Sequence, residues 1–281
     1  MSKVLTIPDF MRMKQEKEPI VMLTAYNHWQ TNLAERAGAD MILVGDSVGM
    51  VEHGLQDTLG VTMEMMIMHC KAVMRARKRA FVVGDLPFLS YEIDEREAIR
   101  NAGLLVKEAG VDAVKLEGGK SRKNAIRAIV NAGIAVVGHI GLTPQTATLL
   151  GGYKVQGKDN ASAKRVFEDA LAVQEAGACA VVLECVPSPL AELITRKLDI
   201  PTIGIGAGSA CDGQVLVFHD ILGLFEAFKP KFVKSYANGV EYLTSGLEEY
   251  VKEVRDKTFP GKEHSFAMDP EIVKKIEAEY F

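Results

Sequence analysis

Six ionisable side chains stand at or near the ends of short apolar segments of the sequence. These segments are rich in Val, Ile, Leu and Ala up to the residue that closes them. The six residues are Asp46, Asp85, Lys115, Glu117, His139 and Glu184. Any one acidic residue at such a place is commonly a helix N-cap or a solvated loop charge. Burying an unpaired charge is costly, however, so their recurrence at five segment ends predicts a shared functional site.

These residue types favour chemistry at a divalent cation. Several carboxylates in one site repel each other unless positive charge joins them, and Lys115 supplies only one such charge. Carboxylates without cysteine or a histidine pair suit Mg²⁺ better than Zn²⁺. We expect Asp46 and Asp85 to be direct ligands, with Glu117 holding a water on the ion and Glu184 free as a base. A 2-oxo acid chelated by Mg²⁺ would then lose a proton to form a stabilised enolate.

A degenerate repeat predicts the elements that hold these residues. Helical patterns end in Ala-Gly at 37–38, 109–110, 132–133 and 176–177, and an apolar run follows each. Glycine suits a helix C-cap, and near-continuous apolar strands are typical of a parallel sheet covered on both faces. The predicted strands are 19–25, 41–46, 80–86, 112–117, 135–140, 179–185, 201–206 and 214–219. The predicted helices are 28–38, 63–76, 95–109, 121–132, 161–176, 189–198, 241–256 and 270–279.

Strand–helix alternation repeated about eight times predicts an α/β fold, a (β/α)8 TIM barrel. A doubly wound open sheet is the alternative, but no G-x-G-x-x-G motif follows the first strand, which runs into Asn27. We expect residues 1–281 to form a single domain, of which about 241–281 is a C-terminal helical extension. The long connections 47–61 and 141–160 follow strand ends, where barrels place their chemistry, and are predicted lids.

Strand alternation predicts which way the ionisable side chains point. Residues two apart share a face, so Lys115 and Glu117 point the same way. If the other strand-end residues also point inward, one mouth of the barrel gathers four carboxylates, a lysine and a histidine. The same alternation sends Cys179 and Cys185 outward, beneath the helices.

Composition excludes several classes of partner. The 33 Lys and Arg against 37 Asp and Glu give a net charge of −4, which argues against a nucleic-acid binder. Hydrophobic residues make up 48% and charged residues 25%, as in ordinary soluble enzymes. No apolar run approaches a membrane span, and residues 1–17 lack the apolar stretch of a signal peptide. Four cysteines without a C-x-x-C pair predict reduced thiols, so we expect a cytoplasmic protein that binds no membrane.

A glycine-rich stretch, Gly204-Ile-Gly-Ala-Gly-Ser209, follows the seventh predicted strand. Many barrels place a phosphate-binding site after this strand, and backbone N–H groups would line it. Close approach of the backbone to a substrate or to a neighbouring loop explains the glycines equally well. Both interpretations stay open at this point.

Eight segments resemble the ketopantoate hydroxymethyltransferase family. They occur in order over nearly the whole chain: VGDSVGMVEHGLQDTLGVTMEMMIMH (44–69), GDLPFLSY (84–91), VKLEGG (114–119), GHIGLTPQ (138–145), GGYKVQG (151–157), LECVP (183–187), IGIGAGSACDGQVLVFHDILG (203–223) and FPGKEHSF (259–266). The resemblance implies a (β/α)8 barrel and dependence on Mg²⁺, one ion per subunit. It implies hydroxymethyl transfer from 5,10-methylenetetrahydrofolate to 3-methyl-2-oxobutanoate, giving 2-dehydropantoate for pantothenate synthesis. It also implies a homo-oligomer, often a decamer.

The resemblance implies a metal site made of three residues. Asp46 stands in the VGDS segment and Asp85 in GDLPF, and both would be metal ligands that also meet the substrate. Glu117 of KLEGG would complete the surroundings of the ion.

The same resemblance implies a substrate site beside the metal. Ser47 of VGDS and Lys115 of KLEGG would bind the substrate, and His139 of GHIGLTPQ would line its pocket. Glu184 of LECVP would accept the proton and so be the catalytic residue. These residues coincide with those that strand alternation brings together.

Three places depart from the family pattern, and two other functions compete. Asn27 stands where many members have Asp, Leu89 is bulky for its segment, and residues 75–79 are unusually basic. One competitor is another Mg²⁺/enolate barrel, a lyase or mutase acting on a different 2-oxo acid, which leaves TPQ, GGYKVQG and CDGQVLV unexplained. The other is a non-catalytic barrel that binds a small metabolite. It predicts that Glu184→Gln changes binding alone.

Overall fold

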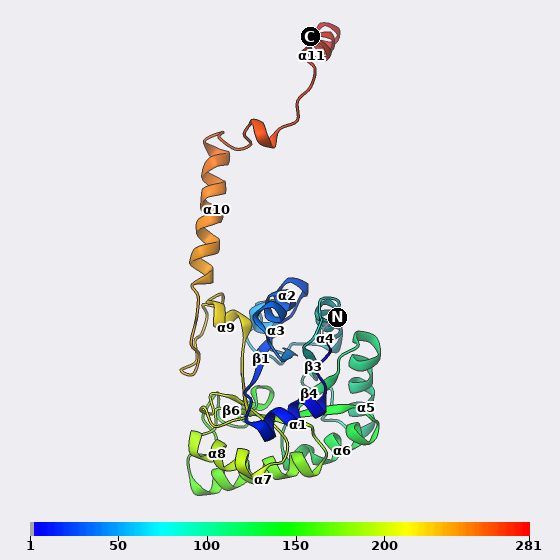
Figure 1. Cartoon of the computed structure of the whole chain (residues 1–281), viewed down its shortest axis with the longest axis vertical. Coiled ribbons are helices and arrows are strands. Elements are labelled where there is room, and N and C mark those ends of the chain that lie inside the picture. Colours follow the sequence, from blue (N-terminus) through cyan, green and yellow to red (C-terminus); the bar gives the residue numbers. More distant parts are fainter. Residues whose placement is uncertain (1–2) are drawn as a thin grey trace.

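Eight parallel strands close into a barrel in the computed structural model, which describes residues 3–281 (Figure 1). Each strand pairs with its neighbour in sequence, and the last pairs with the first. The strands are β1 (Ile20–Thr24), β2 (Met41–Val44), β3 (Phe81–Asp85), β4 (Ala113–Glu117), β5 (Ala135–Gly141), β6 (Ala180–Glu184), β7 (Thr202–Ile205) and β8 (Gly213–Leu216). All eight overlap the predicted segments, so the predicted (β/α)8 fold is confirmed.

The six helices predicted between the strands are present, close to their predicted positions. They are α2 (His28–Ala37), α4 (Met63–Met74), α5 (Glu95–Leu104), α6 (Lys123–Asn131), α7 (Asn160–Glu175) and α8 (Ser188–Lys197). The side chains of Asn27, Thr62, Asp94 and Asp159 each accept a backbone N–H of the helix that follows, which stabilises its first turn. Gly38 ends α2 with a φ of 91°, a left-handed conformation that glycine adopts without steric cost. A π-helical turn continues α5 to the predicted end at residue 109.

An additional helix, α1 (Ile7–Glu16), closes the amino-terminal end of the barrel. Phe10 of this helix is buried in one cluster with Ile20, Met41 and Phe81, the first residues of their strands. The rings of Phe10 and Phe81 meet edge to face, with centroids 5.4 Å apart. Because α1 covers this end, a ligand reaches the barrel interior from the carboxyl-terminal mouth.

Alternate strand residues divide the core into two parts. Val83 and Val182 belong to the cluster inside the barrel that α1 closes. Val82 and Val181, one residue earlier in each strand, belong to the larger cluster between the strands and the surrounding helices. This alternation sets the direction of the polar residues at the ends of the same strands.

The structure corrects the predicted bounds in two places. β2 ends at Val44, two residues before its predicted end, and a short helix α3 (Val48–Val51) follows within the connection 47–61. The predicted eighth strand is cut short, because Phe218–Leu222 form helix α9. Both corrections lie at the carboxyl-terminal mouth, where the chain turns to build the site.

Two helices follow the barrel and extend away from it (Figure 1). They are α10 (Gly239–Arg255) and α11 (Pro270–Tyr280), and neither contains a buried residue. Leu243, Leu247 and Tyr250 form an exposed apolar stripe along α10 at helical spacing. Among residues 3–281, no helix is both long enough and apolar enough to cross a membrane.

Candidate active site

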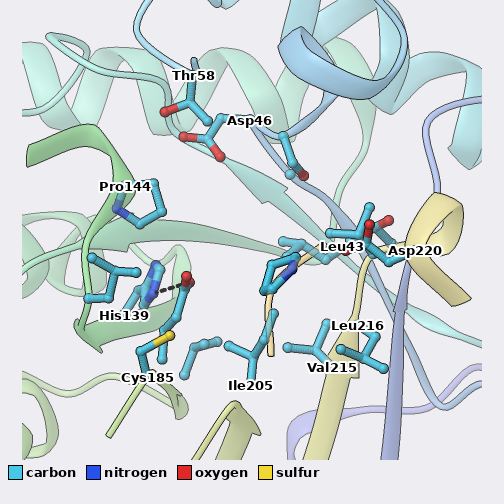
Figure 2. Close-up of a pocket in the computed structure, with 18 of the residues that line it drawn as sticks. Leu43, Asp46, Thr58, His139, Pro144, Cys185, Ile205, Val215, Leu216 and Asp220 are labelled. Carbon is cyan, nitrogen blue, oxygen red and sulfur yellow. Dashed lines mark ion pairs between the residues drawn. The ribbon is translucent and has the colours of Figure 1, made fainter. Parts of the chain in front are cut away.

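A cavity of about 340 Å³ opens at the carboxyl-terminal mouth of the barrel. All seven predicted site residues line it, and Figure 2 labels two of them, Asp46 and His139. They are Asp46, Ser47, Asp85, Lys115, Glu117, His139 and Glu184. The structure therefore brings together the complete set of residues that the sequence singled out, although it does not assign their roles.

Strand alternation explains the direction of five of these side chains. Asp85 follows the inward-pointing Val83, and Glu184 follows the inward-pointing Val182, each by two residues. In the strand register Asp85 is the partner of Lys115, and Glu117 is the partner of His139. Because neighbouring strands hold these partners side by side, the charged groups form pairs.

Asp46 reaches the cavity in a different way. Leu43 is the last interior residue of β2, so continued alternation would turn an even-numbered residue outward. The chain instead leaves the strand at Val44, and the turn into α3 directs the Asp46 carboxylate to the cavity. Its backbone N–H donates to Asp85 Oδ2 over 3.1 Å, which fixes the turn to β3. Asp46 therefore lines the cavity as predicted, but strand alternation, the reason given for that prediction, does not apply to it.

A buried ion pair lies at the base of the cavity. Lys115 Nζ is 2.8 Å from Asp85 Oδ1, and both side chains are at most 4% exposed. Burial lowers the pKa of Lys115, but the carboxylates of Asp85, Glu117 and Asp46 raise it by more, so the ammonium stays charged. Burial raises the pKa of Asp85 to about 7, and Asp46 and Glu117 add to the rise against the opposing effect of Lys115. The carboxyl groups of Asp85, Glu117 and Asp46 therefore surround the single ammonium of Lys115 at this base.

His139 joins this base to Glu184. His139 Nε2 lies 3.1 Å from Glu184 Oε2, and its Nδ1 lies 3.4 Å from Glu117 Oε1. Burial and Lys115 lower the pKa of the imidazole, yet the hydrogen bonds to the two glutamates raise it to about 9. The Glu184 side chain is 15% exposed, whereas those of Glu117 and Asp85 are almost fully buried. Glu184 is thus the most open of these three carboxylates.

Gln145 is a site residue that the sequence did not single out. It lies in a 3-10 turn (Pro144–Thr146) of the long loop after β5. Its Nε2 donates to Asp46 Oδ2 over 2.9 Å, and its backbone N–H donates to Glu117 Oε2 over 3.0 Å. Its Oε1 accepts the hydroxyl of Tyr91 over 2.5 Å. Gln145 ends the GHIGLTPQ segment that resembles the family. An uncharged amide in a loop, however, does not by itself indicate a functional site.

Two hydroxyl groups add polar contacts at the rim. The Ser47 hydroxyl is 2.8 Å from the hydroxyl of Tyr26, a residue that follows β1. Thr58, from the connection between α3 and α4, lines the cavity and is buried. Within residues 3–281 its Oγ1 has no hydrogen-bond partner. A ligand could therefore bind this hydroxyl.

The predicted outward direction of two cysteines is wrong. Cys185 lines the cavity, because its φ of 48° ends the regular alternation of β6 (Figure 2). Cys179 precedes β6 and packs against the interior cluster. Burial raises the pKa of the Cys185 thiol to about 12, and the Glu184 carboxylate adds to this rise. The thiol is therefore neutral.

The glycine-rich stretch after β7 is explained by close packing. Gly206 has a φ of 65°, and a Cβ atom there would lie 2.7 Å from the ring of Phe232. Glycine therefore allows the segment after α9 to approach the barrel. This observation favours the loop-approach interpretation over a phosphate site.

The three departures from the family pattern lie outside the cavity lining. Asn27 caps α2 by accepting the N–H of Gln30, as an aspartate would. Leu89 is 55% exposed, with a φ of 65°. In the basic turn Arg79 pairs with Asp40 over 2.8 Å. None of them alters the groups around the site.

Nearly the whole chain resembles one family of proteins. The model of the family described as ketopantoate hydroxymethyltransferase matches residues 4–262. A protein named 3-methyl-2-oxobutanoate hydroxymethyltransferase from Moorella thermoacetica is 57% identical over 93% of this chain and 97% of its own length. Proteins of the same name from Syntrophotalea carbinolica and Clostridium novyi are 57% and 52% identical, over 95% and 96% of this chain and 100% and 98% of their own.

Solved structures of lower identity share the fold. A phosphonopyruvate hydrolase aligns with a TM-score of 0.60 at 13% identity, covering 99% of this chain and 96% of its own. A 2,3-dimethylmalate lyase, titled as a member of the PEP mutase/isocitrate lyase superfamily, aligns with a TM-score of 0.58 at 18% identity over both whole chains. At such identities these likenesses support the barrel fold alone.

Proposed function

The chain belongs to the ketopantoate hydroxymethyltransferase family, and from this premise we propose that it transfers a hydroxymethyl group to 3-methyl-2-oxobutanoate. The donor is 5,10-methylenetetrahydrofolate. With one water consumed, the products are 2-dehydropantoate and tetrahydrofolate, a step of pantothenate synthesis. The observation that supports this proposal is that Glu184 and the Lys115–Asp85 pair line one cavity, and that His139 lies between them in contact with both.

Glu184 is the base in this proposal. Transfer requires that C3 of the keto acid lose its proton, so that the resulting enolate can attack the methylene carbon. Glu184 is the most exposed carboxylate of the network, and His139 Nε2 lies 3.1 Å from its Oε2, a contact that holds the carboxylate at the cavity. The Lys115 ammonium lies on the other side of His139, 3.3 Å from Nδ1, where it can balance negative charge on the bound keto acid.

The residues at the base of the cavity fit a Mg²⁺ ion. Asp85 Oδ1 and Glu117 Oε1 are buried carboxylate oxygens, the first in an ion pair with Lys115 and the second 3.4 Å from His139 Nδ1. Mg²⁺ is commonly held by one or two protein carboxylates together with water and substrate oxygens, a number that Asp46 and Asp85 can supply. We assign Asp46 and Asp85 as ligands of one Mg²⁺ per subunit, with Glu117 beside them. When bound, the ion supplies positive charge for the enolate oxygen.

We further propose that the protein is a homo-oligomer, a decamer by family resemblance. Parallel strands are normally covered on both faces, yet Val21 of β1 is 45% exposed and Trp29 of α2 is 52% exposed. The apolar stripe of α10 is also uncovered. In this proposal residues 1–281 are one domain, and the extension from about residue 241 serves assembly. Light scattering that gives the mass of a monomer would contradict it.

We also propose a cytoplasmic location, where the four free thiols of the described chain would stay reduced. The proposed substrates are small molecules, and neither nucleic acid nor membrane is a partner in this proposal. The net charge of −4 supports the first exclusion.

A turnover assay tests the proposed reaction. Purified protein is incubated with 3-methyl-2-oxobutanoate and methylenetetrahydrofolate, with Mg²⁺ or with a chelator. We expect 2-dehydropantoate with Mg²⁺ and little without it. Absence of the product under every metal condition would refute the proposed function, and full turnover with chelator would refute the metal roles of Asp46 and Asp85.

A further inference from the structure

The cavity continues outward beyond the charged residues, to Asp220 of α9. Figure 2 shows Asp220 on the opposite side of the cavity from His139 and Cys185, with Ile205 and Val215 lying between. Within residues 3–281 the Asp220 carboxylate makes no hydrogen bond and no ion pair. Burial raises its pKa, and the charge of Lys229 opposes the rise. A half-buried carboxylate that faces a cavity without a partner is suited to a ligand with N–H donors.

Aromatic side chains line this outer half of the cavity. Phe225, Phe228 and Phe232 come from the segment after α9. Tyr153, from the long loop after β5, lines the same cavity nearer to Asp46 and Glu184. Phe228 is 60% exposed and Tyr153 is 55% exposed. Large exposed rings around a cavity that also holds a polar anchor are typical of sites for flat heteroaromatic ligands.

The inner half of the cavity already accounts for the keto acid. Its charges, from Asp85 and Lys115 to Glu184, surround a space suited to a small anion. The outer half has few charges, from Asp220 and Lys231, and its aromatic lining suits a second, flatter molecule. In the proposed reaction that molecule is the folate donor, whose reactive methylene must meet C3 of the keto acid.

We propose that this outer half binds the pterin ring of the folate donor, with the Asp220 carboxylate accepting its paired N–H donors between the aromatic walls. The pterin ring carries a ring N–H next to an amino group, and two parallel hydrogen bonds to one carboxylate match this pair. The ring stacks against Phe228, whose neighbour Lys229 acts on the Asp220 carboxylate. This inference rests on the proposed function, because that function requires a folate donor.

The direct test is calorimetric titration with tetrahydrofolate, which needs no turnover. We expect Asp220→Asn to raise the Kd about 10- to 100-fold, because the amide cannot accept both donors. Phe228→Ala should raise it about tenfold through loss of stacking. Glu226→Gln is the matched control, since this exposed carboxylate lies in the same segment but does not line the cavity. Its Kd should equal that of the unmodified protein.

An analogue separates a hydrogen bond to the ligand from a structural role of Asp220. A tetrahydrofolate whose 2-amino group is replaced by methyl has lost one of the two donors. The unmodified protein should bind this analogue about tenfold or more weakly than tetrahydrofolate, whereas Asp220→Asn should discriminate much less. The proposal would be overturned if Asp220→Asn and the unmodified protein bound tetrahydrofolate with equal Kd. It would also be overturned if both proteins discriminated equally between tetrahydrofolate and the analogue.

Deuterium exchange into C3 of the keto acid without folate tests the proposed function separately. If the unmodified protein exchanges deuterium but Asp220→Asn binds tetrahydrofolate normally, only the folate subsite is refuted. If tetrahydrofolate binds in an Asp220-dependent way but no exchange occurs, the subsite stands and the proposed reaction is refuted. The two failures are therefore distinguishable.

Discussion

Gln145 Nε2 lies 2.9 Å from Oδ2 of Asp46, a residue 99 positions earlier in the chain. The same glutamine holds Glu117 through its backbone N–H, so one loop residue fixes carboxylates that follow β2 and end β4. The loop after β5 therefore completes the charged base of the cavity. Without it, Asp46 would stand on a turn with one backbone contact to Asp85.

The first prediction concerns Gln145. Gln145→Ala removes the side-chain donor to Asp46 but keeps the backbone N–H to Glu117, so we expect kcat/KM to fall roughly 10- to 100-fold. Steady-state kinetics over a range of Mg²⁺ concentrations measure this. Gln156→Ala is the control in the same loop, because its side chain bonds only the carbonyl of Lys154. An unchanged kcat/KM in Gln145→Ala would refute the positioning role.

The second prediction concerns Glu184. Glu184→Gln keeps the shape of the side chain but removes its basicity, so deuterium exchange into C3 of the keto acid should slow about 10²- to 10⁴-fold. Proton NMR of the keto acid in deuterated water measures the rate. Glu192→Gln, an exposed residue of α8, should exchange at the normal rate. Exchange by Glu184→Gln at the normal rate would assign the base elsewhere.

The third prediction concerns the metal. Asp46→Asn removes one of the two assigned ligand charges, so the Mg²⁺ concentration for half-maximal activity should rise about tenfold or more. Calorimetric titration with Mg²⁺ alone should show the same loss of affinity. Asp57→Asn is the control, because Asp57 caps a nearby turn by accepting the N–H of Leu59. Equal Mg²⁺ affinity in Asp46→Asn and unmodified protein would remove Asp46 from the ligand set.

The fourth prediction is a pH dependence of stability at Glu35. Its Oε1 accepts the backbone N–H groups of Lys78, Arg79 and Ala80 over 2.7 to 3.0 Å. Burial raises the pKa of this carboxyl, but these hydrogen bonds outweigh it and hold the pKa below the ordinary value of 4.5. A lowered pKa in the folded state stabilises the protein fully above the unfolded-state pKa. This contribution is lost as the pH falls through the folded-state pKa.

Glu35→Gln should therefore lower the free energy of unfolding by about 1 kcal/mol near neutral pH, because a neutral amide oxygen accepts weaker hydrogen bonds than the carboxylate does. As the pH falls below the ordinary carboxyl pKa of 4.5 and through the lower folded-state pKa, the difference from the unmodified protein should shrink towards zero. Urea titrations at the two pH values measure it, with the exposed Glu249→Gln of α10 as control. A difference that grows as the pH falls would contradict this explanation.

The sequence by itself determined the barrel and most of the residues at its mouth. Strands covered on both faces need almost continuous apolar runs, so a charge that ends such a run is conspicuous. Within a regular strand the alternation of side chains also sets direction. The two-residue spacing of Lys115 and Glu117 is therefore sufficient to place both side chains on one face.

Only the tertiary structure decided the parts where the chain leaves regular strands. Asp46 and Cys185 both enter the cavity through turns, where strand alternation no longer holds. Gln145 and Asp220 come from a loop and a short helix whose positions depend on contacts with distant elements. Local sequence patterns report backbone periodicity and burial, but they do not report which loops meet when the barrel closes, because those contacts join residues far apart in the chain.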